Sequence, residues 1–350
     1  MKLTVVTTTY NQEKYIEKAI KGIVTQKTSF DFKLVISDDC STDNTKEIIK
    51  KYKREYPNKI ELIENPKNLG AMGNFIHTLS QIKNTEYVAL CDGDDFWIDE
   101  NKLQKQVDFL DENRDFSICF HKSKLFYQNK EKEDEIIPKG IEEITTIEDL
   151  VKQNYVIANS VVYRWAFNEN NLEEIFPKDI APGDYYVHLL HAQYGKIKMF
   201  DEVMSAYRRH KDGMWWSNDD TNKEKFTLEY GRKFLNFYNA ADKYMNLPEN
   251  SFYAQRKDII YNMIVTYIKG DKFNELLQNI ISNKDKELFY ENLKDIVNRN
   301  IWFQDYLRQK EKEQKEIQKI RQDAQKLNME LNAIKNSRWW KLRNKIKGCK

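Results

Sequence analysis

Three carboxylates stand within four residues in the stretch Asp92-Gly93-Asp94-Asp95. Acids this close repel one another and raise each other's pKa unless a cation compensates their charge. A divalent metal with hard oxygen ligands is the simplest compensation. The alternative is an acidic turn that caps the following helix, because Asp is common in turns and at helix N-termini. On these residues alone, both interpretations stay open.

Short apolar runs rich in β-branched residues alternate with helical patterns in the N-terminal part of the chain. The strands expected from these runs are Leu3–Thr7, Phe32–Ser37, Ile60–Glu64 and Tyr87–Cys91, with helices at Glu13–Thr25, Thr45–Tyr56 and Met72–Ile82. This alternation predicts an α/β fold with a mostly parallel sheet flanked by helices. A polar cluster follows each strand, and ligands of such sheets bind outside the carboxyl ends of the strands. The site is therefore expected there.

The pattern continues less regularly beyond the acidic stretch. We expect further strands at Phe116–Phe120, Ala158–Arg164 and Gly195–Tyr207, and helices at Lys102–Leu110, Ile144–Val151 and Asp184–Tyr194. The sequence contains neither a Gly-x-Gly-x-x-Gly loop nor a Gly-x4-Gly-Lys-Ser/Thr loop. The usual phosphate-binding loops are therefore missing, and a nucleotide would have to be held by side chains and a metal.

Composition argues against several classes of protein. The 350 residues are enough for one large domain or two smaller ones, and 40% apolar residues allow a sizeable core. A formal net charge of +2 gives no general argument for nucleic-acid binding. The four cysteines are scattered, which argues against a zinc site or a disulfide framework. With no signal-peptide pattern and no apolar run of about 20 residues, a cytoplasmic location is expected.

Four polar blocks in order resemble the successive motifs of family 2 glycosyltransferases. The blocks are Val5–Asn11, Asp38–Thr45, Asn68–Gly70 and Asp92–Asp95. The resemblance covers about residues 1–215, and it departs from the family where Cys40 and Asn44 replace the usual glycines. It implies the GT-A fold and inverting transfer of a sugar from a nucleotide donor, most simply a UDP-sugar.

The resemblance also assigns the donor site residue by residue. Thr8 and Tyr10 would line the nucleoside pocket, with Tyr10 against the uracil ring. Asp39 would accept a hydrogen bond from the base imide, Asn68 would belong to the same donor site, and Asp92 would contact the ribose or the donor sugar. The structural alternatives are ordinary turn packing for Thr8 and Tyr10, and an Asx turn or helix cap for Asp39.

The resemblance makes Asp94 a ligand of Mn²⁺ or Mg²⁺ and Asp184 the general base. A metal suits the growing negative charge of a departing nucleoside diphosphate, and inversion needs a carboxylate that takes the proton of the acceptor hydroxyl. Asp95 stays unassigned between the metal shell and a helix cap. The family more often has Glu-Asp where this chain has Gly183-Asp184, and the alternative role for Asp184 is a helix N-cap.

A cationic and aromatic segment follows the last expected strand. In related enzymes a His at the position of His210 reaches the metal or the phosphates, and Arg208 or Arg209 would assist it. Together they suit a lid over a diphosphate. Trp215 would close this lid or stack on a sugar, with plain packing as the alternative. Asn159 and Ser160 are candidates for the acceptor side, on the resemblance alone.

After Asn222 the strand signals stop and helical patterns take over. We expect a catalytic domain over residues 1–217, a helical module over 218–300, a coiled-coil-like helix over 301–336 and a basic aromatic tail over 337–350. The coiled-coil-like helix carries a heptad seam. It predicts either a parallel homodimer through residues 303–334 or a single solvated helix. The tail suits an anionic membrane surface, with a frayed solvated end as the alternative; nothing else supports nucleic acid.

These observations favour an inverting, metal-dependent glycosyltransferase that uses a UDP-sugar. The acceptor is open among a surface glycan, a lipid-linked oligosaccharide and a protein hydroxyl. The alternatives are a nucleotidyltransferase, which would want a Gly-rich basic loop after the first strand, and a non-catalytic scaffold that binds nucleotide sugars. The expected location is cytoplasmic, with peripheral attachment to the inner face of the membrane if the tail binds lipid.

Overall fold

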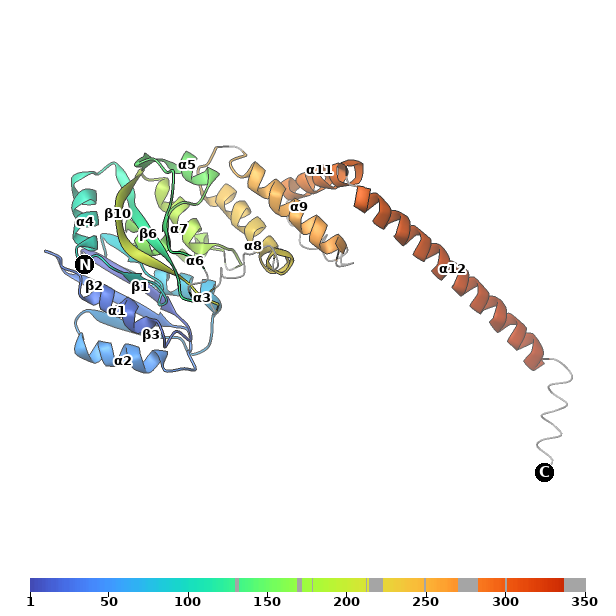
Figure 1. Ribbon diagram of the computed structural model, residues 1–350, viewed down its shortest axis with the longest axis horizontal. Helices are drawn as coiled ribbons and strands as arrows, with labels where there is room; N and C mark the ends of the chain where they lie inside the picture. Colours follow the sequence, from blue (N-terminus) through green and yellow to red (C-terminus); the bar gives the residue numbers. More distant parts are fainter. Residues whose placement is uncertain are drawn as a thin grey trace, which may run out of the picture. The chain divides into compact units, whose positions relative to one another are not determined.

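The computed structural model describes most of the chain (Figure 1). The described residues are 1–129, 132–168, 172–177, 179–211, 213, 223–248, 250–269, 283–299 and 301–336. The chain divides into two compact units, Met1–Phe289 and Tyr290–Lys350. The first unit holds the sheet and the helices that follow it; the finer boundaries at residues 217, 300 and 336 stay predictions.

A mixed sheet of ten strands forms the centre of the first unit (Figure 1). Its main path runs β3-β2-β1-β4-β9-β6-β10-β5, with β7 paired to β6 and β8 paired to β10. The strands are β1 Leu3–Thr9, β2 Phe32–Asp38, β3 Ile60–Glu64, β4 Tyr87–Leu90, β5 Phe96–Trp97, β6 Phe116–Tyr127, β7 Glu135–Ile137, β8 Ile144–Thr145, β9 Val162–Arg164 and β10 Lys196–Arg209. Strands β1 to β4 are parallel to one another, which confirms the predicted mostly parallel α/β sheet.

Helices cover both faces of the sheet (Figure 1). On one face α1 (Ile16–Val24), α2 (Thr45–Glu55) and α4 (Lys102–Glu112) share a buried apolar cluster with the strands. In α1 this follows from the sequence, because its buried apolar residues recur at helical spacing. On the other face lie α3 (Gly70–Ser80) and α7 (Gly183–Ala192). Short elements α5 (Ile147–Lys152), η1 (Ala158–Ser160) and α6 (Leu172–Ile175) complete this part.

Strand β6 departs most from the sequence prediction, because it runs on from Phe120 to Tyr127. It lies between β9 and β10, so buried polar side chains such as His121 and Ser123 replace the apolar pattern that marks a strand. The helix expected at 144–151 begins later, because residues 144–145 pair with β10 and Thr146 starts α5 with a capping box. The strand expected at 158–164 divides into η1 and β9.

Among the described residues, the sheet is followed by α8 (Lys223–Tyr244), α9 (Tyr253–Lys269) and α11 (Asn283–Arg299), as the helical pattern over residues 218–300 predicts. The fully buried guanidinium of Arg256 holds them together. It donates to Asn239 Oδ1 at 2.8 Å and Asp242 Oδ2 at 2.8 Å on α8, and to Asp285 Oδ1 at 2.7 Å on α11. A buried ion pair contributes to stability only when its hydrogen bonds are satisfied, and this one meets that condition.

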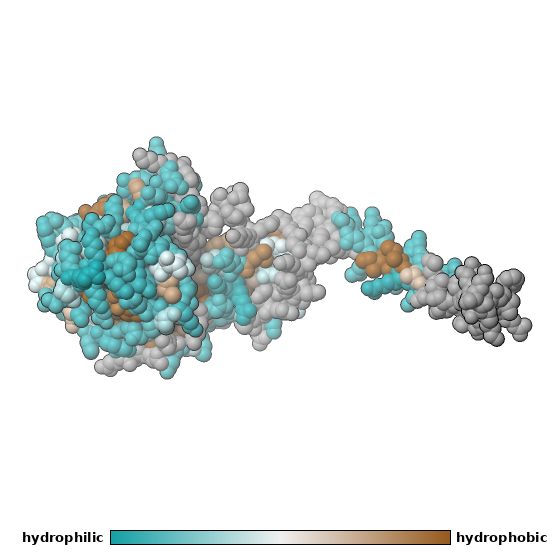
Figure 2. Space-filling view, turned by 90° about the horizontal axis from the view of Figure 1, so that it is seen from below, coloured by the Kyte–Doolittle hydropathy of each residue, from teal (hydrophilic) through white to brown (hydrophobic). Residues whose placement is uncertain are grey.

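The second unit contains the long helix α12 (Ile301–Asn336). Figure 2 shows hydrophobic residues amid hydrophilic ones on its described part. Ile317 is 51% exposed and Ile320 is 65% exposed. A helix is thus confirmed at the expected position, while the homodimer stays a prediction. The tail 337–350 lies outside the described residues. Within the described part of the chain, no helix is long and apolar enough to cross a membrane.

Candidate active site

A cavity of about 660 Å³ opens at the carboxyl ends of the parallel strands, where the sequence predicts the site. Its walls come from the loops after β1, β2, β3 and β4, from α3, from the segment before α7 and from the end of β10. Among the predicted site residues, the cavity is lined by Thr8, Tyr10, Asp39, Asn68, Asp92, Asp94, Asp184, Arg208, Arg209 and His210. The fold therefore brings together residues that lie far apart in the sequence, from the loop after β1 to the end of β10.

Gly93 lets the acidic loop lie directly against the loop after β1. Its N–H donates to the carbonyl oxygen of Thr8 at 3.0 Å. A Cβ at Gly93 would lie 2.9 Å from Thr9 Cβ and 2.3 Å from Gln12 Oε1, closer than real Cβ contacts come. Glycine at this position thus brings Asp92 and Asp94 to the same cavity wall as Thr8.

Asp92 is held close to other acids. Thr8 Oγ1 donates to Asp92 Oδ1 at 3.2 Å. Burial, and then the charges of Asp94 and Asp184, raise the pKa of Asp92 to about 7. The charge of a neighbouring carboxylate thus contributes to the raised pKa of Asp92, as the sequence predicts for clustered acids. A cation nearby would favour the ionised forms and reverse this shift.

Asp95 anchors the loop to the rest of the sheet. Its Oδ1 accepts from the backbone N–H of Arg208 at 2.7 Å, and its Oδ2 accepts from Asn159 Nδ2 at 2.8 Å. Burial and the charges of Asp94 and Asp92 raise the pKa of Asp95 well above its ordinary value. Both carboxylate oxygens are used within the fold, so Asp95 is neither a helix cap nor directed at the cavity.

Asn159 and Ser160 lie behind the site. Asn159 is fully buried and donates to Asp95 and to the carbonyl oxygen of Ala206, while its Oδ1 accepts from Ser205 Oγ at 2.7 Å. Ser160 is also fully buried and donates to the carbonyl oxygen of Ile157 at 2.7 Å. The acceptor role predicted for them stays untested, and their hydrogen bonds favour a structural role.

The two predicted metal ligands meet at the cavity. His210 Nε2 lies 3.0 Å from Asp94 Oδ2, and the imidazole is only 4% exposed. Its ring packs against that of Tyr15, with centroids 4.6 Å apart, and its buried Nδ1 has no hydrogen-bond partner among the described residues. A cation bound by both side chains would take the place of the proton they share.

The two arginines before His210 differ in their surroundings. Arg208 is 8% exposed, and its Nε donates to the carbonyl oxygen of Asp94 at 2.7 Å. Its guanidinium lies between the rings of Tyr15, Phe96 and Phe126, and burial lowers its pKa. Arg208 therefore stiffens the acidic loop, and Arg209, which lines the cavity and is half-buried, is better placed for phosphates.

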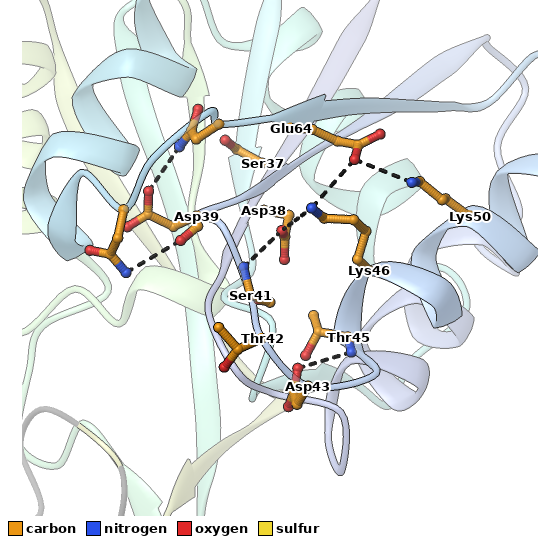
Figure 3. A network of polar contacts seen from close by, with 12 residues as sticks. Ser37, Asp38, Asp39, Ser41, Thr42, Asp43, Thr45, Lys46, Lys50 and Glu64 are labelled. Atoms are coloured by element: carbon orange, nitrogen blue, oxygen red, sulfur yellow. Dashed lines mark hydrogen bonds and ion pairs between the residues drawn. The ribbon is translucent and has the colours of Figure 1, made fainter.

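Asp39 is fixed at the cavity by the loop after β3. Its Oδ1 accepts from the backbone N–H of Leu69 at 2.8 Å and from Asn65 Nδ2 at 3.0 Å. Asn68 Nδ2 donates to the carbonyl oxygen of Asp39 at 3.3 Å. The neighbouring Asp38 points away from Asp39 toward Lys46 (Figure 3). Of this acidic pair, only Asp39 lines the cavity.

Asp184 is the second residue of α7 and lines the same cavity. The backbone N–H of Tyr185 donates to Asp184 Oδ1 at 2.8 Å. Burial is the main reason that the pKa of Asp184 is raised. A carboxylate at a helix N-terminus is stabilised by the helix dipole, so the charged form retains support in spite of burial.

Sequence reasoning missed the apolar part of the cavity wall. Met72 and Phe75 of α3 line it, together with Val156 and Pro182. Their spacing in α3 is that of an ordinary core-facing helix, so no signal separates them from the core. Trp215, predicted for the lid, lies outside the described residues.

Comparison with known protein families assigns the part of the chain that lines the cavity to one family. The sequence matches the model of Glycosyl transferase family 2 over residues 4–213. This range includes every residue that lines the cavity and covers more than half of the chain.

Two relatives illustrate the range of similarity. An uncharacterized protein of Mycobacterium tuberculosis strain H37Rv is 38% identical over 224 residues, 64% of this chain and 63% of the relative. The poly(ribitol-phosphate) β-N-acetylglucosaminyltransferase TarS of Staphylococcus aureus strain Mu50 is 25% identical over 232 residues, 65% of this chain and 39% of that protein. This chain thus spans less than two thirds of the length of both relatives.

A solved structure extends the comparison to the fold. The crystal structure of S. aureus TarS residues 1–349 in complex with UDP-GlcNAc matches with a TM-score of 0.50. The match covers 85% of this chain and 92% of that chain, at 18% sequence identity. At this identity, the likeness shows a shared fold.

Proposed function

This chain belongs to Glycosyl transferase family 2, with the GT-A fold, and on that premise we propose that it transfers a sugar from a UDP-sugar to an acceptor hydroxyl with inversion. One observation carries the proposal: the Asp94–His210 pair and Asp184 come from distant elements and line one cavity. The charges of both Asp94 and Asp184 contribute to the raised pKa of Asp92. Both carboxylates therefore lie near Asp92, which supports a leaving-group site and a base that act on one substrate.

The nucleoside is proposed to lie between the loops after β1 and β2. The ring of Tyr10 is 45% exposed at the cavity and is available to stack on uracil. Asp39 Oδ1 is used by Leu69 and Asn65, whereas its Oδ2 has no hydrogen-bond partner within the described residues. That second oxygen suits the imide N–H of uracil.

Mn²⁺ or Mg²⁺ is proposed to bind at Asp94 and His210. Among the described residues, no group of three or more His, Cys, Asp or Glu side chains is arranged to hold a metal by itself. The donor diphosphate would therefore complete the shell, which suits Mg²⁺ because it commonly binds one or two carboxylates plus phosphates. The raised pKa values of Asp92 and Asp95 fit a site that expects positive charge. When bound, the cation stabilises negative charge on the departing diphosphate.

Asp184 is proposed as the general base. Burial raises the pKa of Asp184 above its ordinary value, which makes it a stronger base than an exposed Asp. The oxygen of the acceptor bonds to the anomeric carbon while the bond from that carbon to the diphosphate oxygen breaks, and the hydroxyl proton moves to Asp184. UDP leaves with the bonding electrons, and Arg209, which lines the cavity, is proposed to donate hydrogen bonds to its phosphates. A single displacement inverts the sugar carbon.

The proposal is tested by UDP release from a panel of UDP-sugars in Mn²⁺, each with candidate glycan, lipid-linked and peptide acceptors. We expect one donor to give turnover, and Asp184→Asn to reduce that turnover at least a hundredfold. Folded wild-type protein that binds UDP but releases none from any donor would favour the scaffold alternative. Release of diphosphate from a nucleoside triphosphate would favour a nucleotidyltransferase.

A further inference from the structure

Helix α8 contacts the chain on both sides of Asp184. Upstream, Asn236 Nδ2 donates to the carbonyl oxygen of Asp179 at 2.9 Å. Downstream, the ring of Phe237 stacks on that of Tyr185, with centroids 5.1 Å apart and planes at 21°. Two successive residues of one helix thus hold both flanks of the segment that carries this carboxylate.

Tyr185 links these contacts with α8 to Asp184 itself. Its backbone N–H donates to Asp184 Oδ1 at 2.8 Å, and its hydroxyl donates to the carbonyl oxygen of Leu150 in α5 at 2.7 Å. The ring is therefore fixed by α5 at its hydroxyl and by α8 on its face. Because the backbone of Tyr185 follows its ring, movement of Phe237 would reach the carboxylate through one peptide unit.

Phe237 is itself well fixed. It is fully buried, and its ring contacts those of Tyr186 at 5.6 Å and Phe252 at 6.0 Å between centroids. Its helix is tied to α9 by the buried guanidinium of Arg256, which donates to Asn239, two residues after Phe237 on α8. Figure 1 shows α7 between the sheet and α8. The first turn of α7 is thus held from both sides by rigid elements.

We propose that Phe237 and Asn236 are positioning residues for Asp184, so that the helices after the sheet complete the active site. The inference rests on the proposed function, in which Asp184 is the base. The residues proposed for the donor come from the loops after β1, β2 and β4 and from the end of β10. Loosening α8 should therefore reduce turnover and leave donor binding unchanged, since small misplacement of a catalytic group costs up to about a hundredfold.

The test compares Phe237→Leu with Phe234→Leu in the full chain. Phe234 is the matched control, because it lies one turn away on α8 and contacts Phe226 and Tyr238 of the same helix. We expect Phe237→Leu to lower kcat by about 10- to 100-fold with the donor KM and the UDP affinity unchanged, and Phe234→Leu to stay within about twofold. Equal kcat in the two variants, or an equal loss of UDP affinity and kcat, would overturn the proposal.

Two further measurements keep the outcome decisive. If Phe237→Leu does not fold, Asn236→Ala removes the hydrogen bonds to the carbonyl oxygen and Oδ2 of Asp179 and should lower kcat by about threefold or more; wild-type kcat would contradict the proposal. Amide hydrogen exchange at residues 183–188 should be faster in Phe237→Leu and in Asn236→Ala than in Phe234→Leu. This measurement reports the positioning of the segment independently of turnover. If Asp184→Asn retains wild-type kcat, the base assignment fails; if it is inactive while both α8 variants are fully active and protected, only the positioning fails.

Discussion

Two acidic loops flank the same central strand, and the fold treats their charge differently. Asp38 and Asp39 follow β2, the acidic stretch from Asp92 to Asp95 follows β4, and both strands pair with β1. In the first loop, each acid has one oxygen that accepts hydrogen bonds from donors of the fold. Asp38 Oδ2 accepts from the N–H of Ser41 at 3.1 Å and lies 3.9 Å from Lys46 Nζ. Lys46 continues to Glu64 in a network that stays within the protein (Figure 3).

In the second loop, the charge of Asp94 contributes to the raised pKa of both Asp92 and Asp95. Burial and neighbouring carboxylates act on Asp92 and Asp95, and only Asp95 has both oxygens fixed by donors of the fold. The comparison teaches that clustered acids do not by themselves indicate a site. The surroundings of the acids decide: Asp38 lies near Lys46 of the fold, whereas Asp92 and Asp94 line the cavity, where a bound cation would neutralise them.

The largest expected difference is between Asp94→Asn and the matched change Asp38→Asn. A bound metal is worth several kcal/mol of transition-state stabilisation, and each 1.36 kcal/mol is tenfold in rate. We therefore expect turnover to fall by about a thousandfold in Asp94→Asn and to change little in Asp38→Asn. Steady-state kinetics in Mn²⁺ would measure both. Equal losses in the two variants would abolish the distinction between the loops.

Substitutions in the two loops should affect the free energy of unfolding in the opposite order, with the larger loss in the first loop. Asp38→Ala removes a buried acceptor and leaves the N–H of Ser41 and the amine of Lys46 without it. Loss of such a partner costs about 1 to 3 kcal/mol. Asp94→Asn should keep the wild-type free energy of unfolding or increase it, because it removes a charge that contributes to the raised pKa of Asp92 and Asp95. Urea unfolding without metal would measure both, and a destabilised Asp94→Asn would argue against repulsion in the second loop.

The pH dependence of turnover should report the ionisation of Asp184. Asp184 must be deprotonated to act as a base, and burial raises its pKa above the ordinary value. Turnover should therefore fall as pH is lowered, by about tenfold per pH unit below that pKa, and the fall should begin above pH 4, the usual range for Asp. A profile of kcat against pH would measure this. A flat profile down to pH 4 would contradict the role of Asp184.

The smallest expected effect lies in the first loop, at Cys40. Its φ is 62°, in the left-handed region that favours glycine. Cys40→Gly should relieve this strain and increase the free energy of unfolding by about 0.5 to 1 kcal/mol, without change in UDP affinity. Thermal unfolding with and without UDP would check both. Destabilisation would mean that contacts of the Cys40 side chain stabilise the loop by more than the strained backbone at Cys40 destabilises it.

The sequence was sufficient for the parallel half of the sheet, because strands such as β4 are continuous apolar runs followed by turn residues. It was insufficient where polar residues are buried. The polar half of β6 and the buried Asn159 are satisfied by partners distant in the chain, such as Ser205, and no local pattern announces them. For the same reason, the sequence left Asp95 unassigned, since its partners lie on β10 and η1.

The contribution of α8 was also beyond sequence reasoning. Phe237 has the helical spacing of any buried aromatic residue, and its stacking on Tyr185 depends on how α8 packs against α7. By contrast, Asp94 and His210 were paired in advance, because the family resemblance supplied a common role that neither residue indicates alone. Their 3.0 Å separation agrees with that role.

The central claim is that the loop after β4 is completed by a cation shared with a nucleoside diphosphate. Calorimetric titration of UDP into the metal-free protein, with and without Mn²⁺, tests it most directly. The account predicts at least tenfold tighter binding in Mn²⁺, about 1.4 kcal/mol, reversal by a chelator, and no effect of Mn²⁺ in Asp94→Asn. Equal UDP affinity with and without Mn²⁺ in the wild-type protein would contradict it.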